Sequence, residues 1–215
     1  GFFSRRWAGT TVLNEHGFRE RSFRVPKPPG TYRIAIIGDS FTYGNGLEQA
    51  DRYSDRLQQL LPAGYEVLNF GIAGNNTPQH LDTLRAAVMP ADPDFVLLQW
   101  FVNDVEGSDL SGRPQTSPLL PIAAWHRWLN AHSALYTVAN MPWAEAQIML
   151  GRAPSYADYL RGRTGDANSP DSRRDAALLR EIIETARRRQ TAIGIVLFPD
   201  PGQDLGAAYP FPFLH

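Results

Sequence analysis

Three short segments of the chain carry residue types that could together perform acyl chemistry. The first contains Asp39 and Ser40, the second is glycine-rich and contains Gly74, and the third contains Asn103 and Asp104. A serine hydroxyl can attack an acyl carbon, and backbone N–H groups or a side-chain amide can donate hydrogen bonds to the oxyanion that forms. We therefore predict Ser40 as a nucleophile, and the Ser40 N–H, the Gly74 N–H and the Asn103 amide as an oxyanion hole. Asp39 and Asp104 are expected to support these groups, Asp39 as a hydrogen bonder that organises its loop rather than as the catalytic acid.

Each of these segments follows a predicted strand. Short apolar or β-branched runs bounded by turn residues predict strands, and apolar residues at helical spacing predict helices between them. Strands that alternate with amphipathic helices favour a parallel sheet, and in such sheets the site lies beyond the carboxyl ends of the strands. The predicted strands are 32–37, 65–70, 94–100 and 192–198, and the predicted helices are 47–61, one from residue 78 and one from residue 170.

The chain departs from this alternation after the third strand. Residues 104–167 are rich in Trp, Tyr, Pro and Leu, and we interpret them as a helical insertion. Its residues Trp125, Trp128 and Trp143 suggest a lid over the site. The predicted fold class is therefore α/β, with a doubly wound, flavodoxin-like parallel sheet and a helical insertion after the third strand.

The N-terminal residues lack the alternating strand and helix patterns of the rest of the chain. Residues 1–30 are polar and irregular and end in a proline-rich stretch, where proline fixes φ and removes backbone donors. We expect them to form an arm and linker, with residues 31–215 as the domain.

Composition and charge exclude several classes of function. Among the 215 residues, 21 Lys and Arg face 22 Asp and Glu, so no basic field would hold nucleic acid. The chain contains no cysteine, which excludes thiolate catalysis and cysteine metal sites. No apolar run in the sequence approaches the roughly 18 residues that a membrane span needs.

The three segments resemble the first three sequence blocks of the SGNH (GDSL-type) hydrolase family, in the same order and each after a strand. The resemblance covers about residues 31–105, and Asn14-Glu-His-Gly-Phe-Arg19 is similar to a segment that precedes the first block in some members. It implies an SGNH hydrolase-like α/β fold and hydrolysis of an acyl ester of a carbohydrate or lipid by Ser40. It implies neither a metal nor a cofactor, and the implied partner is a small-molecule or glycan ester.

The family takes its catalytic acid and base from a fourth block, Asp-x-x-His, and this chain does not contain it. His215 is the C-terminal histidine, but the residue three positions before it is Pro212. We therefore expect the acid and base to lie beyond His215, together with a C-terminal strand and helix. The remaining histidines are expected to be surface or structural residues rather than the base: His16, His80, His126 and His132.

Other interpretations stay open at this point. A polysaccharide O-acetyltransferase would use the same residues with a sugar hydroxyl as acceptor, and a non-catalytic carbohydrate-binding or scaffold domain could retain the fold. A phosphate- or nucleotide-binding flavodoxin-like module also places a turn before a helix. The first segment lacks the glycine-rich phosphate-binding patterns, however, and Asp39 would repel phosphate. Each segment could also be an ordinary capped turn.

Overall fold

Four parallel strands form one sheet in the order β2-β1-β3-β4. The computed structural model describes residues 11–106, 119 and 122–198. Each strand lies within one residue of its predicted range at either end, which confirms the strand predictions. The strands are β1 (Tyr32–Ile37), β2 (Tyr65–Asn69), β3 (Phe95–Trp100) and β4 (Ala192–Leu197).

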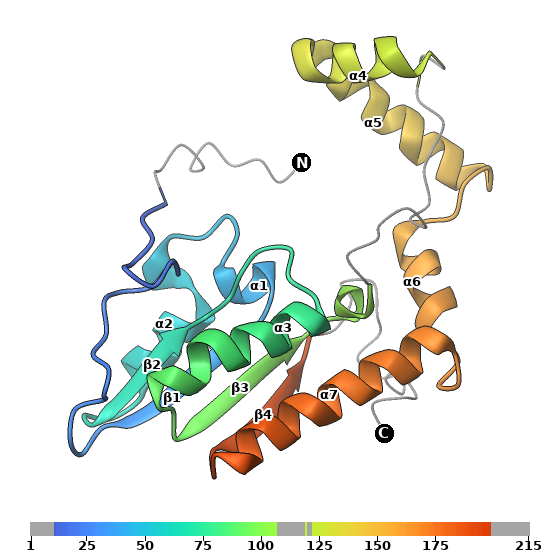
Figure 1. Cartoon of the computed structure of the whole chain (residues 1–215). Helices are drawn as coiled ribbons and strands as arrows, with labels where there is room; N and C mark the ends of the chain where they lie inside the picture. Colours follow the sequence, from blue (N-terminus) through green and yellow to red (C-terminus); the bar gives the residue numbers. More distant parts are fainter. Residues whose placement is uncertain (1–10, 107–118, 120–121, 199–215) are drawn as a thin grey trace.

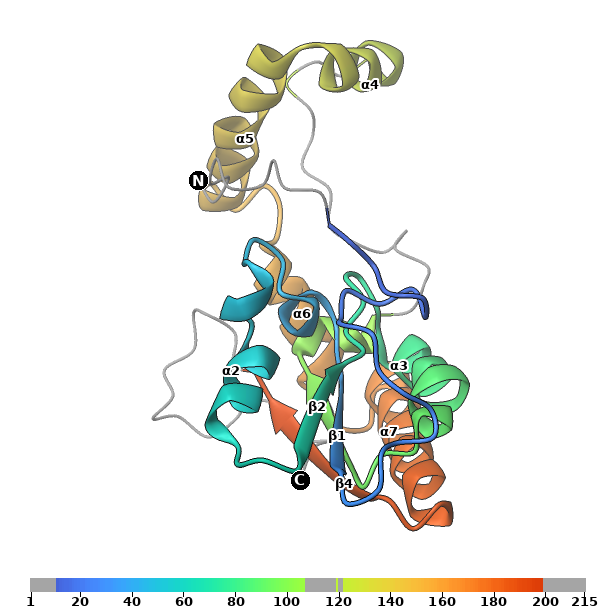
Figure 2. The same cartoon turned by 90° about the vertical axis from the view of Figure 1, so that its left-hand side faces the viewer.

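Helices cover both faces of this sheet (Figure 1). Figure 2 shows α2 (Tyr53–Leu60) on one face, and α3 (Thr77–Thr83) with α7 (Pro170–Arg188) on the other. This arrangement confirms the doubly wound α/β class. Most of the core lies between the sheet and the layer of α3 and α7, and it includes the buried side chains Ile37, Leu68, Leu81, Leu84, Leu98, Leu179 and Ile182.

Two predicted helices bury the faces that their spacing predicts. Leu81, Leu84 and Val88 are all buried, although α3 ends at Thr83 and the chain continues as a π turn (η3, Leu84–Val88) and a 3-10 turn (η4, Met89–Ala91). In α7 the cap is the predicted one, because the Ser172 N–H donates to Ser169 Oγ at 3.1 Å.

The predicted helix over 47–61 is wrong in its first half. Residues Gln49–Asp51 form a 3-10 turn (η2), Arg52 has extended backbone with ψ of 147°, and α2 begins only at Tyr53. The buried guanidinium of Arg52 binds the Asp55 carboxylate at 2.7 Å, and this contact holds the break in place. Leu60, expected on the buried face, is 83% exposed because α2 packs mainly against β2 at the edge of the sheet.

The predicted helical insertion follows β3 and the 3-10 turn η5 (Val102–Val105). It contains α4 (Ala123–His132), α5 (Ala134–Met149) and α6 (Tyr156–Thr164). The α4–α5 hairpin extends away from the sheet, whereas α6 packs against α7 and η5 (Figure 1). Among the described helices, none combines the length and apolar character that a bilayer crossing requires.

The three tryptophans of the insertion lie on this hairpin. Trp125 and Trp128 on α4 are more than half exposed, and Trp143 on α5 is 38% exposed. Because the hairpin points away from the sheet in both views, the lid role stays a prediction that this conformation does not display.

Residues 14–24 lie against the domain. The Phe18 ring packs edge-on against Phe70 with centroids 4.9 Å apart, and the Glu20 carboxylate accepts a hydrogen bond from the Asn69 N–H at 2.9 Å. The buried guanidinium of Arg33 on β1 donates to the Arg24 carbonyl at 2.8 Å. The division of the chain at residue 30 stays a prediction, although this part of the predicted arm contacts the sheet.

A buried carboxyl group joins α7 to the end of β3. Asp175 accepts a hydrogen bond from Trp100 Nε1 at 3.2 Å, and both side chains are buried. Burial raises the pKa of Asp175 to about 6, and the nearby Asp104 carboxylate raises it further, whereas the hydrogen bonds from Thr77 and Trp100 and the charge of Arg174 lower it. The folded protein therefore binds a proton at this carboxyl group more tightly than the unfolded chain does.

This pKa predicts how stability changes with pH. A raised carboxyl pKa contributes stability that is complete below the unfolded value of about 3.9 and is lost as the pH rises through the folded value. Asp175→Asn should therefore flatten the fall in the free energy of unfolding between pH 4 and pH 7 by about 1 to 3 kcal/mol, measured by urea unfolding. Asp82→Asn, at an exposed position of α3, is the control. Equal pH slopes for the wild type and Asp175→Asn would contradict the prediction.

Candidate active site

Ser40 is the first residue of the short helix α1 (Ser40–Tyr43), directly after β1. Asp39 caps this helix, since its carboxylate accepts a hydrogen bond from the Phe41 N–H at 3.0 Å. This is the hydrogen bond expected of a residue that organises the loop. The first N–H groups of a helix have no partner within the helix and favour nearby negative charge, and the half-buried Ser40 is the first residue of this helix.

A buried cluster of polar side chains contacts the turn that carries Asp39 and Ser40. Gln99 Oε1 accepts hydrogen bonds from Thr42 Oγ1 at 2.9 Å and from the Asp39 N–H at 3.3 Å, and Thr42 Oγ1 lies 2.7 Å from the Tyr53 hydroxyl. A Cβ at Gly38 would lie 2.8 Å from Thr42 Cβ and 2.4 Å from Gln99 Oε1, so a side chain there would displace this cluster. Gln99 is a supporting residue that was not predicted; the signal for it is a lone polar residue in the apolar run of β3.

The end of β2 and the loop that follows it contact the segment that carries Ser40. Asn69 Nδ2 donates to the Thr42 carbonyl at 2.6 Å, and the Ile72 N–H donates to the Gly38 carbonyl at 3.0 Å. A Cβ at Gly71 would lie 2.5 Å from the Tyr43 nitrogen. The absence of a side chain at Gly71 therefore allows this loop to approach the turn that carries Ser40.

Gly74 lies further along the same loop. Its φ is +86°, a conformation that favours glycine, and its Cβ position has open space around it. Two residues later, Asn76 caps α3 with a hydrogen bond from the Gln79 N–H at 3.3 Å. The capped helix fixes the end of the loop that contains Gly74.

The loop after β3 holds Asn103 and Asp104 within η5. The Asp104 carboxylate accepts a hydrogen bond from the Phe101 N–H at 2.9 Å, and the Asp104 carbonyl accepts one from Thr77 Oγ1 at 3.2 Å. Asn103 Oδ1 is buried and has no hydrogen-bond partner among the described residues. The third loop is thus tied to the start of α3.

A buried contact between His80 and Asp104 strengthens this tie. His80 Nε2 on α3 lies 3.4 Å from Asp104 Oδ2, and both side chains are fully buried. Burial raises the pKa of Asp104 to about 6 and also raises the pKa of Asp39, and in both cases His80 opposes the effect. His80 therefore joins α3 to the third loop.

The four described histidines make no hydrogen bond with Ser40. His80 faces Asp104, and His16 is exposed beside Glu15. On the hairpin, His126 Nδ1 lies 2.8 Å from the Tyr136 hydroxyl, and His132 stacks on Trp128. The remaining histidine, His215, and the position of Pro212 lie outside the described residues.

The structure brings the three predicted segments to one edge of the sheet. β1 lies between β2 and β3 and is parallel to both, so Ser40, Gly74 and Asn103 all follow the carboxyl ends of neighbouring strands. The Phe41 and Phe101 rings lie 5.1 Å apart, which connects the first loop with the third. This arrangement can present a hydroxyl group among backbone and side-chain hydrogen-bond donors. Within the described ranges, no group of three or more His, Cys, Asp or Glu side chains could hold a metal ion.

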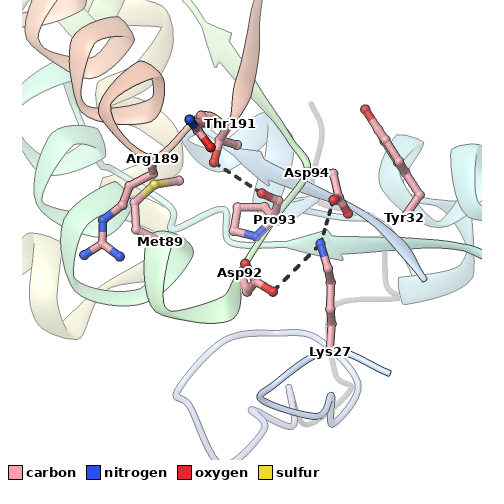
Figure 3. Close-up of a pocket in the computed structure, with 9 residues that line it drawn as sticks. Lys27, Tyr32, Met89, Asp92, Pro93, Asp94, Arg189 and Thr191 are labelled. Carbon is pink, nitrogen blue, oxygen red and sulfur yellow. Dashed lines mark hydrogen bonds and ion pairs between the residues drawn. The ribbon is translucent and has the colours of Figure 1, made fainter. Parts of the chain in front are cut away.

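An open cavity of about 450 Å³ lies at the opposite edge (Figure 3). Lys27, Tyr32, Asp94 and Thr191 line it, close to the amino ends of β1, β3 and β4, and Lys27 pairs with Asp94 at 2.6 Å. Its position separates it from the loops that follow the carboxyl ends of the strands, so it is not part of the candidate active site.

Comparisons with known proteins agree with the sequence motifs. A model of the GDSL-like lipase/acylhydrolase family matches residues 36–213. A search among curated proteins returned no match.

Several solved structures are similar to this chain at low identity. AlinE4, an SGNH-hydrolase family esterase, is 16% identical over 76% of this chain and 75% of its own, with a TM-score of 0.34. TesA is 20% identical over 73% and 98%, with a TM-score of 0.33. A catalytic mutant of Axe2, an acetylxylan esterase from Geobacillus stearothermophilus, is 19% identical over 75% and 74%, with a TM-score of 0.33. TM-scores of this size support no inference about function.

The close approach at Gly71 predicts a stability defect. In Gly71→Ala the new methyl group would collide with the backbone of Thr42 and Tyr43, so α1 must shift and the free energy of unfolding should fall by about 1 to 3 kcal/mol. Gly162→Ala is the matched control, because its Cβ meets open space within α6 and alanine favours a helix. Urea unfolding measures both variants. An unchanged unfolding midpoint for Gly71→Ala would show that the loop has room for a side chain.

Proposed function

Because the chain belongs to the GDSL-like lipase/acylhydrolase family and is therefore an ester-hydrolysing enzyme, we propose that Ser40 is its nucleophile. We further propose that the substrate is an acyl ester of a carbohydrate or a lipid. The observation that carries the proposal is the position of Ser40 at the first residue of α1, at the edge where the loops after β1, β2 and β3 meet.

In the proposed reaction Ser40 Oγ attacks the acyl carbon and gives its proton to a general base. The Ser40 N–H, the Gly74 N–H and the Asn103 side-chain amide donate hydrogen bonds to the oxyanion of the tetrahedral intermediate. Collapse of the intermediate releases the alcohol, which takes up the proton, and leaves an acyl group on Ser40. Water then attacks this acyl group, releasing the carboxylic acid and restoring the serine.

Several features of the loops support these roles. Backbone contacts connect the turn of Ser40 with the loop of Gly74, and the Thr77 and His80 contacts to Asp104 connect that loop with Asn103. The described histidines do not hydrogen-bond with Ser40, so we assign the general base to a residue outside the described ranges.

Two alternatives use the same fold. A polysaccharide O-acetyltransferase would pass the acyl group from Ser40 to a sugar hydroxyl, and comparison of transfer with hydrolysis in the presence of an acceptor separates it from an esterase. A non-catalytic binding domain would leave Ser40 unreactive. A fluorophosphonate probe that fails to label Ser40 in the full-length protein would favour the binding domain.

Ser40→Ala tests the nucleophile directly. Removal of the hydroxyl group should lower kcat for p-nitrophenyl acetate hydrolysis by about 10⁴-fold or more, because residues of such a site act as a unit. Release of p-nitrophenol by the full-length protein measures the effect. Ser22→Ala, an exposed serine in the N-terminal segment, should match the wild type. Wild-type turnover by Ser40→Ala would reject Ser40 as the nucleophile.

Asn103→Ala tests the side-chain donor of the oxyanion hole. Loss of one such donor typically lowers kcat by about 10²- to 10³-fold, and KM should change little because the donor acts on the transition state. Asn103→Asp, which keeps the size but not the amide, should be at least as impaired. If both variants kept kcat within twofold of the wild type, Asn103 would have no part in oxyanion binding.

A further inference from the structure

We propose that Arg19, upstream of the three motif segments, is a positioning residue that holds the nucleophile turn in place. This inference rests on the proposed role of Ser40. The family model begins to match at residue 36, so Arg19 lies outside the matched region. Its guanidinium nevertheless contacts the helix that begins at Ser40.

Arg19 binds two backbone carbonyls at the C-terminal end of α1 and a third in the turn that follows. Nη1 donates to the Gly44 carbonyl at 2.8 Å and to the Tyr43 carbonyl at 3.2 Å, and Nη2 donates to the Leu47 carbonyl at 2.6 Å. The last carbonyls of a helix have no partner within the helix, and a cation near them is favourable. Arg19 therefore satisfies the end of the helix opposite to the nucleophile.

The carbonyls that Arg19 binds belong to a turn that returns to Ser40 itself. The N–H groups of Gly44 and Asn45 both donate to the Ser40 carbonyl at 3.0 Å. Gly44 is left-handed, with φ of 77°, so the chain reverses there immediately after a helix of four residues. Through these bonds, a displacement at the Gly44 turn is transmitted to the backbone of Ser40.

A helix of this length needs external support. One turn fixes several backbone dihedral angles for very few hydrogen bonds, so short helices are unstable by themselves. Asp39 supports α1 at its N-terminus, and Arg19 supplies the corresponding contacts at its C-terminus. The planar guanidinium can donate in several directions at once, which a lysine ammonium on a flexible chain does less well.

Arg19 is itself held in place. The fully buried guanidinium of Arg52 donates to the Arg19 carbonyl and lies 3.5 Å from the Glu20 carboxylate. The Asn14 side chain accepts a hydrogen bond from the Phe18 N–H at 3.0 Å and forms the turn that precedes Arg19. A Cβ at Gly44 would lie 2.5 Å from Arg52 Cγ, so the two arginines and the Gly44 turn pack directly together.

Catalysis depends on the position of the Ser40 hydroxyl group, which the Arg19 contacts help to fix. A shift of about 1 Å in a reacting group can lower a rate about 100-fold. Loss of the Arg19 contacts frees the end of α1, and we expect the Ser40 hydroxyl to lose its orientation while substrate binding at the other loops persists. Arg19 variants should therefore lower kcat more than they raise KM.

The test compares Arg19→Ala and Arg19→Lys with Arg21→Ala in the full-length protein. Arg21 lies on the same segment and also binds the domain, but at Gln58 Oε1 and the Val67 carbonyl rather than at α1. We expect Arg19→Ala to lower kcat for p-nitrophenyl acetate and the rate of Ser40 labelling by a fluorophosphonate about 10- to 100-fold. Arg19→Lys should be intermediate, and Arg21→Ala should remain close to the wild type.

Two further measurements separate positioning from general destabilisation. Hydrogen exchange at the amides of residues 43–45 should accelerate in Arg19→Ala but not in Arg21→Ala. Millimolar ethylguanidinium should restore part of the kcat of Arg19→Ala and none of that of Arg21→Ala. Because hydrogen exchange does not depend on activity, it tests whether Arg19 holds the turn after α1 even if the wild type fails to hydrolyse the ester.

The outcomes distinguish the two proposals. Absence of hydrolysis and of Ser40 labelling in the wild type would reject the proposed function. An active wild type with equal kcat, labelling and exchange rates in Arg19→Ala and Arg21→Ala would overturn the role of Arg19. Faster exchange with an unchanged kcat would overturn it as well, because the turn would then move without affecting the nucleophile.

Discussion

The parallel pairing of β1 with two neighbours is the constraint on which the site depends. Ile36 pairs with Asn69 on β2, and Ile37 pairs with Leu98 on β3. Because the central strand is aligned with both, the chain leaves the sheet three times at the same edge. Short contacts then hold these exits together, among them the hydrogen bond from Ile72 to Gly38 and that from Thr77 to Asp104. A slip of one residue in either pairing would turn Asn69 or Gln99 toward the opposite face and break the polar cluster under Ser40.

Features with a local cause could be predicted from the sequence. The strands are short apolar runs between turn residues, and the α7 cap is a serine before a proline, so neighbouring residues decide them. The position of Ser40 at a helix start follows from the same kind of local signal. The prediction of a helix over 47–61 was wrong in its first half because the chain breaks at Arg52. The buried Arg52 side chain pairs with Glu20 and Asp55, and the spacing of apolar residues gives no sign of these ion pairs.

The polar groups that shape the site could not be predicted, because their partners are distant in the sequence. Thr42 and Gln99 lie 57 positions apart, and Arg19 and Gly44 lie 25 apart. No periodicity encodes such pairs. A polar residue within an apolar strand, as with Gln99, indicates only that some partner must exist, since an unpaired buried amide is costly. The contacts of Arg19 give still less indication, because they are hydrogen bonds to backbone carbonyls, which any sequence offers.

The hydrogen bond from the Tyr156 hydroxyl to the Glu106 carboxylate closes the insertion where it leaves and rejoins the body of the protein. A chain excursion that starts and ends at one point is a loop in the polymer sense, and its closure entropy grows only with the logarithm of its length, about 0.6 kcal/mol per doubling. Two insertions that differ twofold in length would therefore differ by only about 0.6 kcal/mol in the cost of closure at this junction. The α4–α5 hairpin lies within this excursion, so its length can change at little entropic cost to the rest of the fold.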